Sequence, residues 1–435
     1  MESLWQHDFE RSEHPKLTGE RSTDVLVIGG GMAGLLTAYC LKQKGIAAVL
    51  MEKDRIASAT TAHTTAKISA QHGLRYHQIL SRFGEERAKL YFEANRTAVE
   101  ALKSLCRMAD CGLEEKDNFV YSSDLRKIDM EMAALQKIGV DAKLTEYLPD
   151  FIPGTGAVGF RNQGQFHPLK LVQFLAKDLE IYENTKVTEL IGTTAVTDSG
   201  RIKAKRIVIA THFPFLNKHG SYFLKLYQHR SYVLALENAP ALEAMYVDDS
   251  LSGMSFSSFG GYFLLGGGGH RTGKRGGSYP ALREFAKEQL ADARERFHWA
   301  AQDTMSLDGI PYIGNYSRNT PDLFVAAGFN KWGMTGSMLS AALLSAMIGG
   351  EQKDYAPIFS PSRSILRPQL MVNCLETAAN FLYPTTRRCP HLGCALKYNR
   401  EEHSWDCSCH GSRFSENGEV LNNPANGDLR KKPMR

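Results

Sequence analysis

A short apolar run followed by a glycine-rich turn constrains the fold of this chain more than any other feature. Residues 24–28 read DVLVI, a continuous apolar run that is typical of a buried parallel strand. The turn that follows has the pattern G-x-G-x-x-G, with glycines at Gly29, Gly31 and Gly34. A helix predicted over 33–44 and a second strand over 47–51 complete a strand–helix–strand unit. The sequence therefore predicts an α/β sheet with parallel strands at this point of the chain.

The glycine turn has the properties of a dinucleotide site. One glycine permits the tight turn, one lets the backbone approach a pyrophosphate, and one allows close packing of helix on strand. The helix N-terminus offers free N–H groups and partial positive charge to phosphates. Glu52 stands at the end of the second strand, where an acid that accepts ribose hydroxyls is expected. At this motif alone FAD, NAD(P) and a turn without ligand are all alternatives, and dinucleotide binding is favoured.

Cysteines cluster near the C-terminal end. Four of the eight lie in the paired sequences CPHLGC (389–394) and CSCHGS (407–412), and such clustering in a cytosolic chain indicates metal or redox chemistry. We assign the metal ligands as Cys389, His391, Cys407 and His410. Two thiolates for one iron and two imidazoles for the other make the Rieske arrangement of a 2Fe-2S cluster. A structural zinc site is the alternative, and the paired loops, each with an extra cysteine and a glycine, favour iron–sulfur.

Bulk properties exclude several classes of protein. The formal net charge of +5 over 435 residues is modest, and the basic residues are spread apart from Arg430, Lys431, Lys432 and Arg435, so no nucleic-acid partner is expected. The N-terminus lacks the apolar region of a secretory signal, which predicts a cytoplasmic protein. The most apolar stretch, 338–348, is too short to cross a bilayer and predicts a buried helix. Peripheral membrane contact stays open.

The remaining pattern indicates a two-part body and a tail. A long amphipathic helix is predicted over 83–108, and strands over 206–210, 232–236 and 262–265. A linker is expected over 360–368 and a helix over 371–383. The expected division is a flavoprotein over 1–358, a linker and helix over 359–388, and an iron–sulfur module over 389–435. Within the flavoprotein, the expected cofactor-binding parts are about 20–75, 150–215 and 305–350, the remainder being the substrate part.

Several motifs resemble the D-amino acid oxidase and glycine oxidase-like superfamily. They are RIASATTAHTTAKISAQHG (55–73), Ala210-Thr211-His212, DGIPYIG (308–314) and GFNKWGMT (328–335). The resemblance covers about residues 20 to 350 and implies FAD as the cofactor. It also implies a Rossmann-like α/β FAD-binding domain with an α+β substrate domain. The cofactor-binding residues expected from the motifs are Gly29, Gly31, Gly34, Glu52, Thr60, Thr61, Thr64, Thr65, Ala210, Thr211, Gly328, Lys331, Trp332 and Gly333.

As a whole the chain resembles bacterial FAD-dependent oxidoreductases that carry a C-terminal Rieske domain. In Rieske proteins that this chain resembles, a pair of extra cysteines forms a disulfide that joins the two loops. The resemblance implies such a disulfide between Cys394 and Cys409 here. Such domains place several strands before the first ligand loop, whereas only 28 residues separate Ser360 from Cys389 here. We therefore expect a small, truncated all-β module.

The combined pattern predicts an FAD-dependent dehydrogenase that oxidises a small amine or amino-acid-like substrate and passes electrons from flavin to the cluster. Alternatives are a redox sensor or electron-transfer protein, or a flavin oxidase with a vestigial cluster. A Rieske oxygenase would need a further iron site; His72 and His77 have suitable spacing, but Ser69 stands where an acid or Asn is usual.

No catalytic residue, particular substrate or final electron acceptor follows from the sequence. His63, His167 and His212 are interpreted as structural histidines. The side chains with a chance of facing the substrate are Arg161, Arg230, Tyr232, His270 and Arg271.

Overall fold

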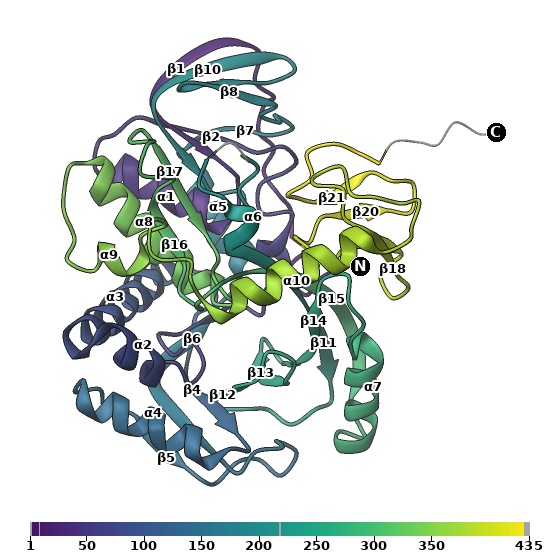
Figure 1. The fold of residues 1–435 in the computed structure, drawn as a ribbon. Coiled ribbons are helices and arrows are strands. Elements are labelled where there is room, and N and C mark those ends of the chain that lie inside the picture. The colour runs from purple at the N-terminus through teal and green to yellow at the C-terminus, as the bar shows by residue number, and fades with distance from the viewer. Residues whose placement is uncertain (1, 8, 217–218, 430–435) are drawn as a thin grey trace.

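The structure is a computed structural model and describes residues 2–7, 9–216 and 219–429. Two large sheets with their helices form a body, and a small sheet lies at one side of it (Figure 1). We call residues 389–429 the C-terminal module. The basic residues from Arg430 onward lie outside the described residues. Among the helices described, none is both long and apolar enough to span a membrane.

The first sheet is mainly parallel and is built around β1. Its strand order is β16–β17–β10–β1–β2–β7, with β9 on β10 and β8 on β9. Val27 of β1 lies between Val208 of β10 and Leu50 of β2. Because both faces are covered, the end of β1 is apolar at every position. The strands are β1 (Gly19–Ile28), β2 (Ala48–Met51), β7 (Glu180–Tyr182), β8 (Glu189–Ile191), β9 (Thr194–Val196), β10 (Gly200–Ile209), β16 (Tyr312–Asn315) and β17 (Leu323–Ala327).

The second sheet is mainly antiparallel, in the order β15–β11–β14–β13–β12–β4–β6–β3, with β5 on β6. One of its faces contributes Val233, Leu264 and Trp299 to the core that it shares with the helices of the first sheet. Its strands are β3 (Lys67–Ile68), β4 (Glu114–Ser122), β5 (Lys143–Thr145), β6 (Gly156–Gln165), β11 (Leu226–Glu237), β12 (Met245–Asp248), β13 (Ser255–Phe259), β14 (Tyr262–Arg271) and β15 (Arg294–Ser306).

Helices cover the first sheet and the outer parts of the second. α1 packs against α8, which is buried on nearly all sides and contains the predicted helix over 338–348. The helix predicted over 83–108 is α3, which begins after Gly84, whose φ of +81° ends α2. The helices of the body are α1 (Met32–Gln43), η1 (Thr60–His63), α2 (Tyr76–Phe83), α3 (Glu85–Met108), α4 (Leu125–Lys137), α5 (Pro168–Ala176), α6 (Tyr222–Lys225), α7 (Ser278–Gln289), α8 (Gly333–Ile348) and α9 (Ala356–Phe359).

The C-terminal module is a small antiparallel sheet preceded by one helix. Its strands, in order, are β18 (Leu396–Asn399), β19 (Ser404–Cys407), β20 (Arg413–Ser415) and β21 (Val420–Asn422). Between 360 and 388 the described chain contains α10 (Pro368–Leu382) and no strand, so this helix stands where Rieske domains usually have strands. α10 lies across the body and reaches the module (Figure 1).

The helix α10 has a reversed amphipathic character. Asn373 and Asn380 are its buried residues, whereas Met371 and Leu375 are 69% and 67% exposed. A helix on a protein surface normally buries its apolar side. The polar side of α10 therefore meets polar groups of the module and the body.

Candidate flavin and iron–sulfur sites

The three glycines of the first turn have three separate structural roles. Gly29 has a φ of +113°, and a Cβ atom there would collide with the carbonyl of Ala210. A Cβ on Gly34 would collide with the carbonyl oxygen of Gly29, so this position sets the close approach of α1 to β1. A Cβ on Gly31 would meet only Thr61 Oγ1, at 3.5 Å. Gly31 therefore keeps space free for a ligand rather than for the protein itself.

Glu52 borders this turn and holds it. Its carboxylate accepts hydrogen bonds from the backbone N–H groups of Gly30 (2.7 Å) and Asp54 (3.0 Å). Burial raises the pKa of Glu52, and these two hydrogen bonds oppose the shift. The predicted ribose-binding acid thus lies beside the glycine turn.

A cavity of about 360 Å³, which we call the nucleotide cavity, opens over the turn. The expected cofactor-binding residues that line it are Gly29, Gly31, Glu52, Thr60, Thr61, Ala210, Thr211, Lys331 and Gly333. The other five expected residues do not line the cavity. Trp332 stacks on His72 with ring centroids 5.2 Å apart, and Gly34 packs on Gly29. Thr64 and Thr65 accept hydrogen bonds at their carbonyls from Trp5 and Gln165, and Gly328 packs against Leu226.

Two helix N-termini face the nucleotide cavity. Gly31 and Met32 begin α1, and Gly333 and Met334 begin α8; all four line the cavity. Free N–H groups and the helix dipoles make both ends favourable for phosphate or another electron-rich group. The cavity is thus suited to an extended anionic dinucleotide.

A strained turn lies between β17 and α8. Asn330 and Lys331 have φ angles of 53° and 73°, which few residues other than glycine adopt. The side-chain oxygen of Asn330 accepts from Ser306 N at 2.9 Å and fixes the turn. Lys331 lies near Asp303; burial lowers the pKa of Lys331 and raises that of Asp303, and each opposes the shift of the other. The turn therefore brings a partly buried cation to the cavity wall, beside the partly buried carboxylate of Asp303 on β15.

His212 differs from the other two histidines that we interpreted as structural. His63 Nδ1 is hydrogen-bonded to the carbonyl of Ala59, and His167 Nδ1 accepts from Lys170 N at the start of α5. His212 lines the nucleotide cavity, and its ring has hydrogen-bond contacts with the side chain of Gln228 and the backbone of Gln302. Burial lowers its pKa to about 4, so the imidazole is neutral at pH 7.

The two ligand loops of the C-terminal module repeat one backbone design. Cys389 N donates to Cys394 O, and Cys407 N donates to Ser412 O, both at 2.9 Å. In each loop the glycine N–H returns to the first cysteine carbonyl, from Gly393 and from Gly411, again at 2.9 Å. Corresponding residues of the two ligand loops therefore make the same backbone hydrogen bonds.

The four assigned ligands form a pair of thiols and a pair of imidazoles. Cys389 and Cys407 are buried with their thiols in contact, and backbone N–H groups of both loops point at the sulfurs. The rings of His391 and His410 lie edge to face, 5.0 Å apart between centroids. Burial lowers the pKa of His391 to about 4 and that of His410 to about 3. Neutral imidazoles are the form that binds metal, and the buried Nδ1 of His410 has no described partner.

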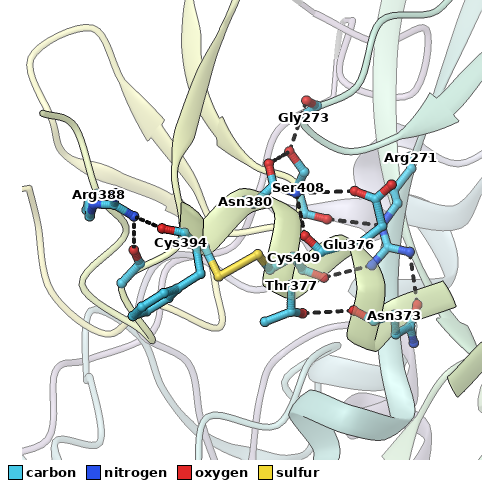
Figure 2. Close-up of a disulfide and its surroundings, with 12 residues drawn as sticks. Arg271, Gly273, Asn373, Glu376, Thr377, Asn380, Arg388, Cys394, Ser408 and Cys409 are labelled. Carbon is cyan, nitrogen blue, oxygen red and sulfur yellow. Dashed lines mark hydrogen bonds between the residues drawn. A yellow bond between two sulfur atoms is a disulfide. The ribbon is translucent and has the colours of Figure 1, made fainter. Parts of the chain in front are cut away.

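A disulfide joins the two ligand loops (Figure 2). It links Cys394 to Cys409, as the resemblance implied. One group of at least three possible ligands among the described residues has all its ligand atoms within 4.8 Å, namely Cys394, Cys407, Cys409 and His410. Because the sulfurs of Cys394 and Cys409 are bonded to each other, Cys407 and His410 are the members of this group that can still bind a metal.

The polar side of α10 and the body hold the disulfide loop. Arg271 donates to the carbonyls of Ser408 and Cys409, both at 3.0 Å, and to Asn373 Oδ1 at 2.9 Å (Figure 2). Ser408 Oγ bonds the carbonyl of Gly273 at 3.1 Å. The body thus provides the support that the small sheet lacks.

Four of the five side chains with a chance of facing the substrate have partners within the protein. Arg230 and Tyr232 contact Glu402, His270 bonds the Tyr232 hydroxyl, and Arg271 holds the disulfide loop. Arg230 and Tyr232 belong to β11, His270 and Arg271 belong to β14, and none of the four lines the nucleotide cavity. Arg161, the fifth candidate, is 63% exposed at its side chain.

The two histidines considered for a further iron have other partners. His72 bonds Ser69 O and the Tyr91 hydroxyl, and burial lowers its pKa to about 3. His77 Nδ1 bonds Glu131 at 2.8 Å. The described residues therefore provide no two-His, one-carboxylate site around this pair.

The sequence profile of the FAD-dependent oxidoreductase family matches residues 24–347. The chain belongs to this family. The profile of the Rieske [2Fe-2S] domain matches residues 365–433, so FAD and a Rieske 2Fe-2S cluster are the cofactors. The match to the Rieske profile includes α10.

Individual proteins are similar to this chain in sequence or in fold. A Bacillus subtilis protein, YhfW, described as a Rieske 2Fe-2S iron–sulfur protein, is 34% identical over 98% of this chain and 96% of its own length. Glycine oxidase from Geobacillus kaustophilus has a similar fold, with a TM-score of 0.66, 20% identity, and coverage of 79% of this chain and all of that one. L-proline dehydrogenase from P. horikoshii has the same TM-score at 18% identity, covering 79% of this chain and 98% of that one.

Proposed function

We propose that this chain oxidises a small amine or amino acid at its flavin and passes the electrons to its Rieske cluster. Bound flavin accepts two electrons from a C–H bond next to nitrogen and can release them singly, which suits a one-electron acceptor such as 2Fe-2S. The protein contributes the placement of the two cofactors and of the substrate.

The observation that carries the electron route is Gln302, on β15, which contacts both sites. Its side-chain Nε2 donates to the carbonyl of Gly411, next to the ligand His410, at 2.9 Å. The main-chain carbonyl of Gln302 accepts a hydrogen bond from Thr60 Oγ1 at 3.3 Å, and Thr60 lines the nucleotide cavity. One residue therefore separates a ligand loop from the wall of the cavity.

A second contact runs beside the first. Thr304, which lines the nucleotide cavity, donates through Oγ1 to Gln228 Oε1 at 3.1 Å. Gln228 packs so tightly against Gly411 that a Cβ on this glycine would collide with its side chain. The hydrogen bonds from Gln302 to Gly411 and from Thr304 to Gln228 lie within buried protein, which supports a direct route between the two cofactor sites.

The substrate class is supported by a second cavity, next to the turn at Asn330. This side cavity, of about 190 Å³, shares Asn330 with the nucleotide cavity and is also lined by Arg75 and Tyr227. The guanidinium of Arg75 forms no hydrogen bond or ion pair with the described residues. A free guanidinium in a cavity is suited to a carboxylate, because it can donate two parallel hydrogen bonds. The solved structures with the same fold include glycine oxidase and L-proline dehydrogenase, whose names indicate amino-acid substrates.

The decisive experiment uses His391→Ala, which removes an iron ligand without touching the nucleotide cavity. After anaerobic mixing with amines and amino acids, flavin should bleach at the parental rate, while steady-state reduction of a one-electron acceptor should collapse. His403→Ala is the matched control, because His403 belongs to the same module and its side chain is 72% exposed. This control should keep both activities.

Two outcomes would contradict the proposal in different ways. If His391→Ala lacks its cluster yet reduces the acceptor as fast as the parent, the cluster is vestigial and the chain is a flavin oxidase. If no amine or amino acid bleaches the parental flavin, the substrate class is wrong and a redox sensor is favoured.

A further inference from the structure

The nucleotide cavity is lined by residues of the C-terminal module as well as by the flavoprotein body. The segment 420–428, which we call the closing loop, contains β21 and the turn after it. The closing-loop residues that line the cavity are Val420, Leu421, Asn422, Asn423, Ala425, Asn426 and Asp428. A Rieske segment far away in the sequence therefore forms part of the wall of the FAD site.

Hydrogen bonds fix the closing loop to the body. Asn423 Nδ2 donates to the carbonyls of Thr211 (2.9 Å) and Phe213 (2.6 Å), directly after β10. Asn426 Nδ2 donates to Phe215 O at 3.3 Å, and its carbonyl accepts from Lys186 Nζ. Thr211 and Lys186 themselves line the cavity. The loop thus closes onto residues that border the cofactor.

The contacts indicate which part of FAD lies nearest to the loop. Thr185 N donates to the carbonyl of Glu52 at 2.9 Å, so Lys186 stands next to the acid expected to bind the ribose. The closing loop meets Lys186 through Asn426. The closing loop therefore lies next to the part of the cavity expected to hold the nucleotide half of the cofactor, rather than next to the turn at Asn330.

The chemistry of the closing loop suits this position. Three of its cavity-lining residues are asparagines, whose amides can both donate and accept hydrogen bonds. The asparagines add no charge beside the phosphates, and their short side chains leave space in the cavity. The carboxylate of Asp428 on the same wall accepts a hydrogen bond from Val420 N at 2.9 Å. An adenine or ribose group offers both donors and acceptors to such amides.

The loop is also tied to the cluster. Ala425 N donates to Ser412 Oγ at 3.0 Å, and the Ser412 side chain hydrogen-bonds the thiol of the ligand Cys389. One serine thus connects a cluster ligand to the wall of the nucleotide cavity.

We propose that the closing loop of the Rieske module is a binding element for the nucleotide half of FAD, so that flavin is retained only while the module is docked. The match to the FAD-dependent oxidoreductase family ends at residue 347, before this loop. Here the second cofactor's own module completes the site of the first.

The first test is Asn423→Ala in the full-length holoprotein. Loss of two hydrogen bonds to the cavity wall should speed FAD release on dilution about tenfold, measured by the fluorescence of free flavin. Asn417→Ala is the matched control, because Asn417 is an exposed asparagine of the same module that does not line the cavity. Iron and sulfide content should match the parent in both variants.

A second measurement does not depend on how any variant folds. Hydrogen exchange of the parental chain, with and without FAD, should show slower exchange in peptides spanning 420–426 when FAD is bound. Peptides spanning 396–405, in the same module but outside the cavity wall, should not change. Unchanged exchange in the closing loop, or parental FAD release from an iron-loaded Asn423→Ala protein, would overturn the proposal.

Discussion

Arg230 and Glu402 form an ion pair that is buried where the body meets the C-terminal module. Arg230 Nε lies 3.0 Å from Glu402 Oε2, and the two side chains are only 4% and 6% exposed. Arg413 also contacts Glu402, at 3.1 Å, and Asp406, at 2.9 Å. Arg230 of the body and Glu402 of the module are thus paired across the interface, and Arg413 and Asp406 of the module balance the remaining charge beside them.

Replacing Glu402 by Gln should weaken this interface strongly. Removing one partner of a buried pair leaves the other charge unpaired, at a cost of about 3–5 kcal/mol in the free energy of unfolding. The measurement is urea unfolding followed by the visible absorption of the cluster. Glu401→Gln, at the exposed neighbouring position, is the control and should unfold like the parent. A parental unfolding curve for Glu402→Gln would mean that the pair contributes nothing to docking.

The same pair predicts a dependence on pH. Burial alone would raise the pKa of Glu402, but Arg230 and Arg413 outweigh it and hold the pKa below its usual value of 4.5. A carboxyl with a lower pKa in the folded than in the unfolded state stabilises the fold above pH 4.5, and this stabilisation is lost as the pH falls through the folded-state pKa. Parent and Glu402→Gln should therefore differ most near pH 7 and converge in acid. Unfolding measured at several pH values checks this, and a constant difference between the two would refute it.

Replacing Gly31 by Val should abolish FAD binding and leave the fold intact. The new side chain enters the space reserved for the pyrophosphate, whereas the nearest protein atom, Thr61 Oγ1, is 3.5 Å from the Cβ position. Gly31→Ala, with one methyl group, should bind more weakly than the parent but better than Val. Flavin absorbance of the purified proteins and circular dichroism measure the two effects. Full flavin occupancy in Gly31→Val would show that this turn does not hold the cofactor.

Replacing Cys407 by Ser should remove the cluster. Cys407 is fully buried and its thiol contacts that of Cys389, so loss of one thiolate leaves the shared iron without its pair. Iron and acid-labile sulfide should fall to background in metal analysis. Cys40→Ala and Cys106→Ala should keep the parental iron content, because neither side chain lies near the ligand loops. Zinc without iron or sulfide in the parent would contradict the Rieske assignment.

Replacing Arg75 by Met tests the carboxylate site of the side cavity. Hydrogen bonds between a charged donor and a charged acceptor contribute about 1.5–3 kcal/mol, so KM for amino-acid substrates should rise about ten- to hundredfold. Simple amines, which lack the carboxylate, should be affected little. Arg96→Met, on the exposed surface of α3, is the control. Equal effects on amines and amino acids would mean that Arg75 acts on folding or on the cofactor instead.

The sequence predicts those parts of the molecule whose structure is determined by residues close together along the chain. The strand 24–28, the glycine turn and the helix α1 follow one another within a few residues, so their order alone specifies the unit. The ligand loops are also local, since each six-residue sequence contains a thiol, an imidazole and the glycine that closes its turn. The position of α10 was predictable for the same reason, because its ends are set by local signals.

Contacts between distant segments had no such signal. Arg230, inside β11, and Arg271, at the end of β14, are among the side chains that the sequence left open for substrate contact. Their true partners, Glu402 and the disulfide loop, lie more than 130 residues away. The closing loop was equally unpredictable, because asparagines before and after a proline are typical of any surface turn. The sequence did suggest why outside support is needed, through the shortage of residues between Ser360 and Cys389.

The buried pair of Arg230 and Glu402 also has a consequence for synthesis of the chain on the ribosome. Glu402 is made 172 residues after Arg230, and N-terminal parts of a protein generally fold first during translation. Until Glu402 has been made, Arg230 lacks its partner in the pair, so the emerging flavoprotein has an uncompensated cation at the face that the module later covers. Docking of the module is therefore a late step in the synthesis of this chain.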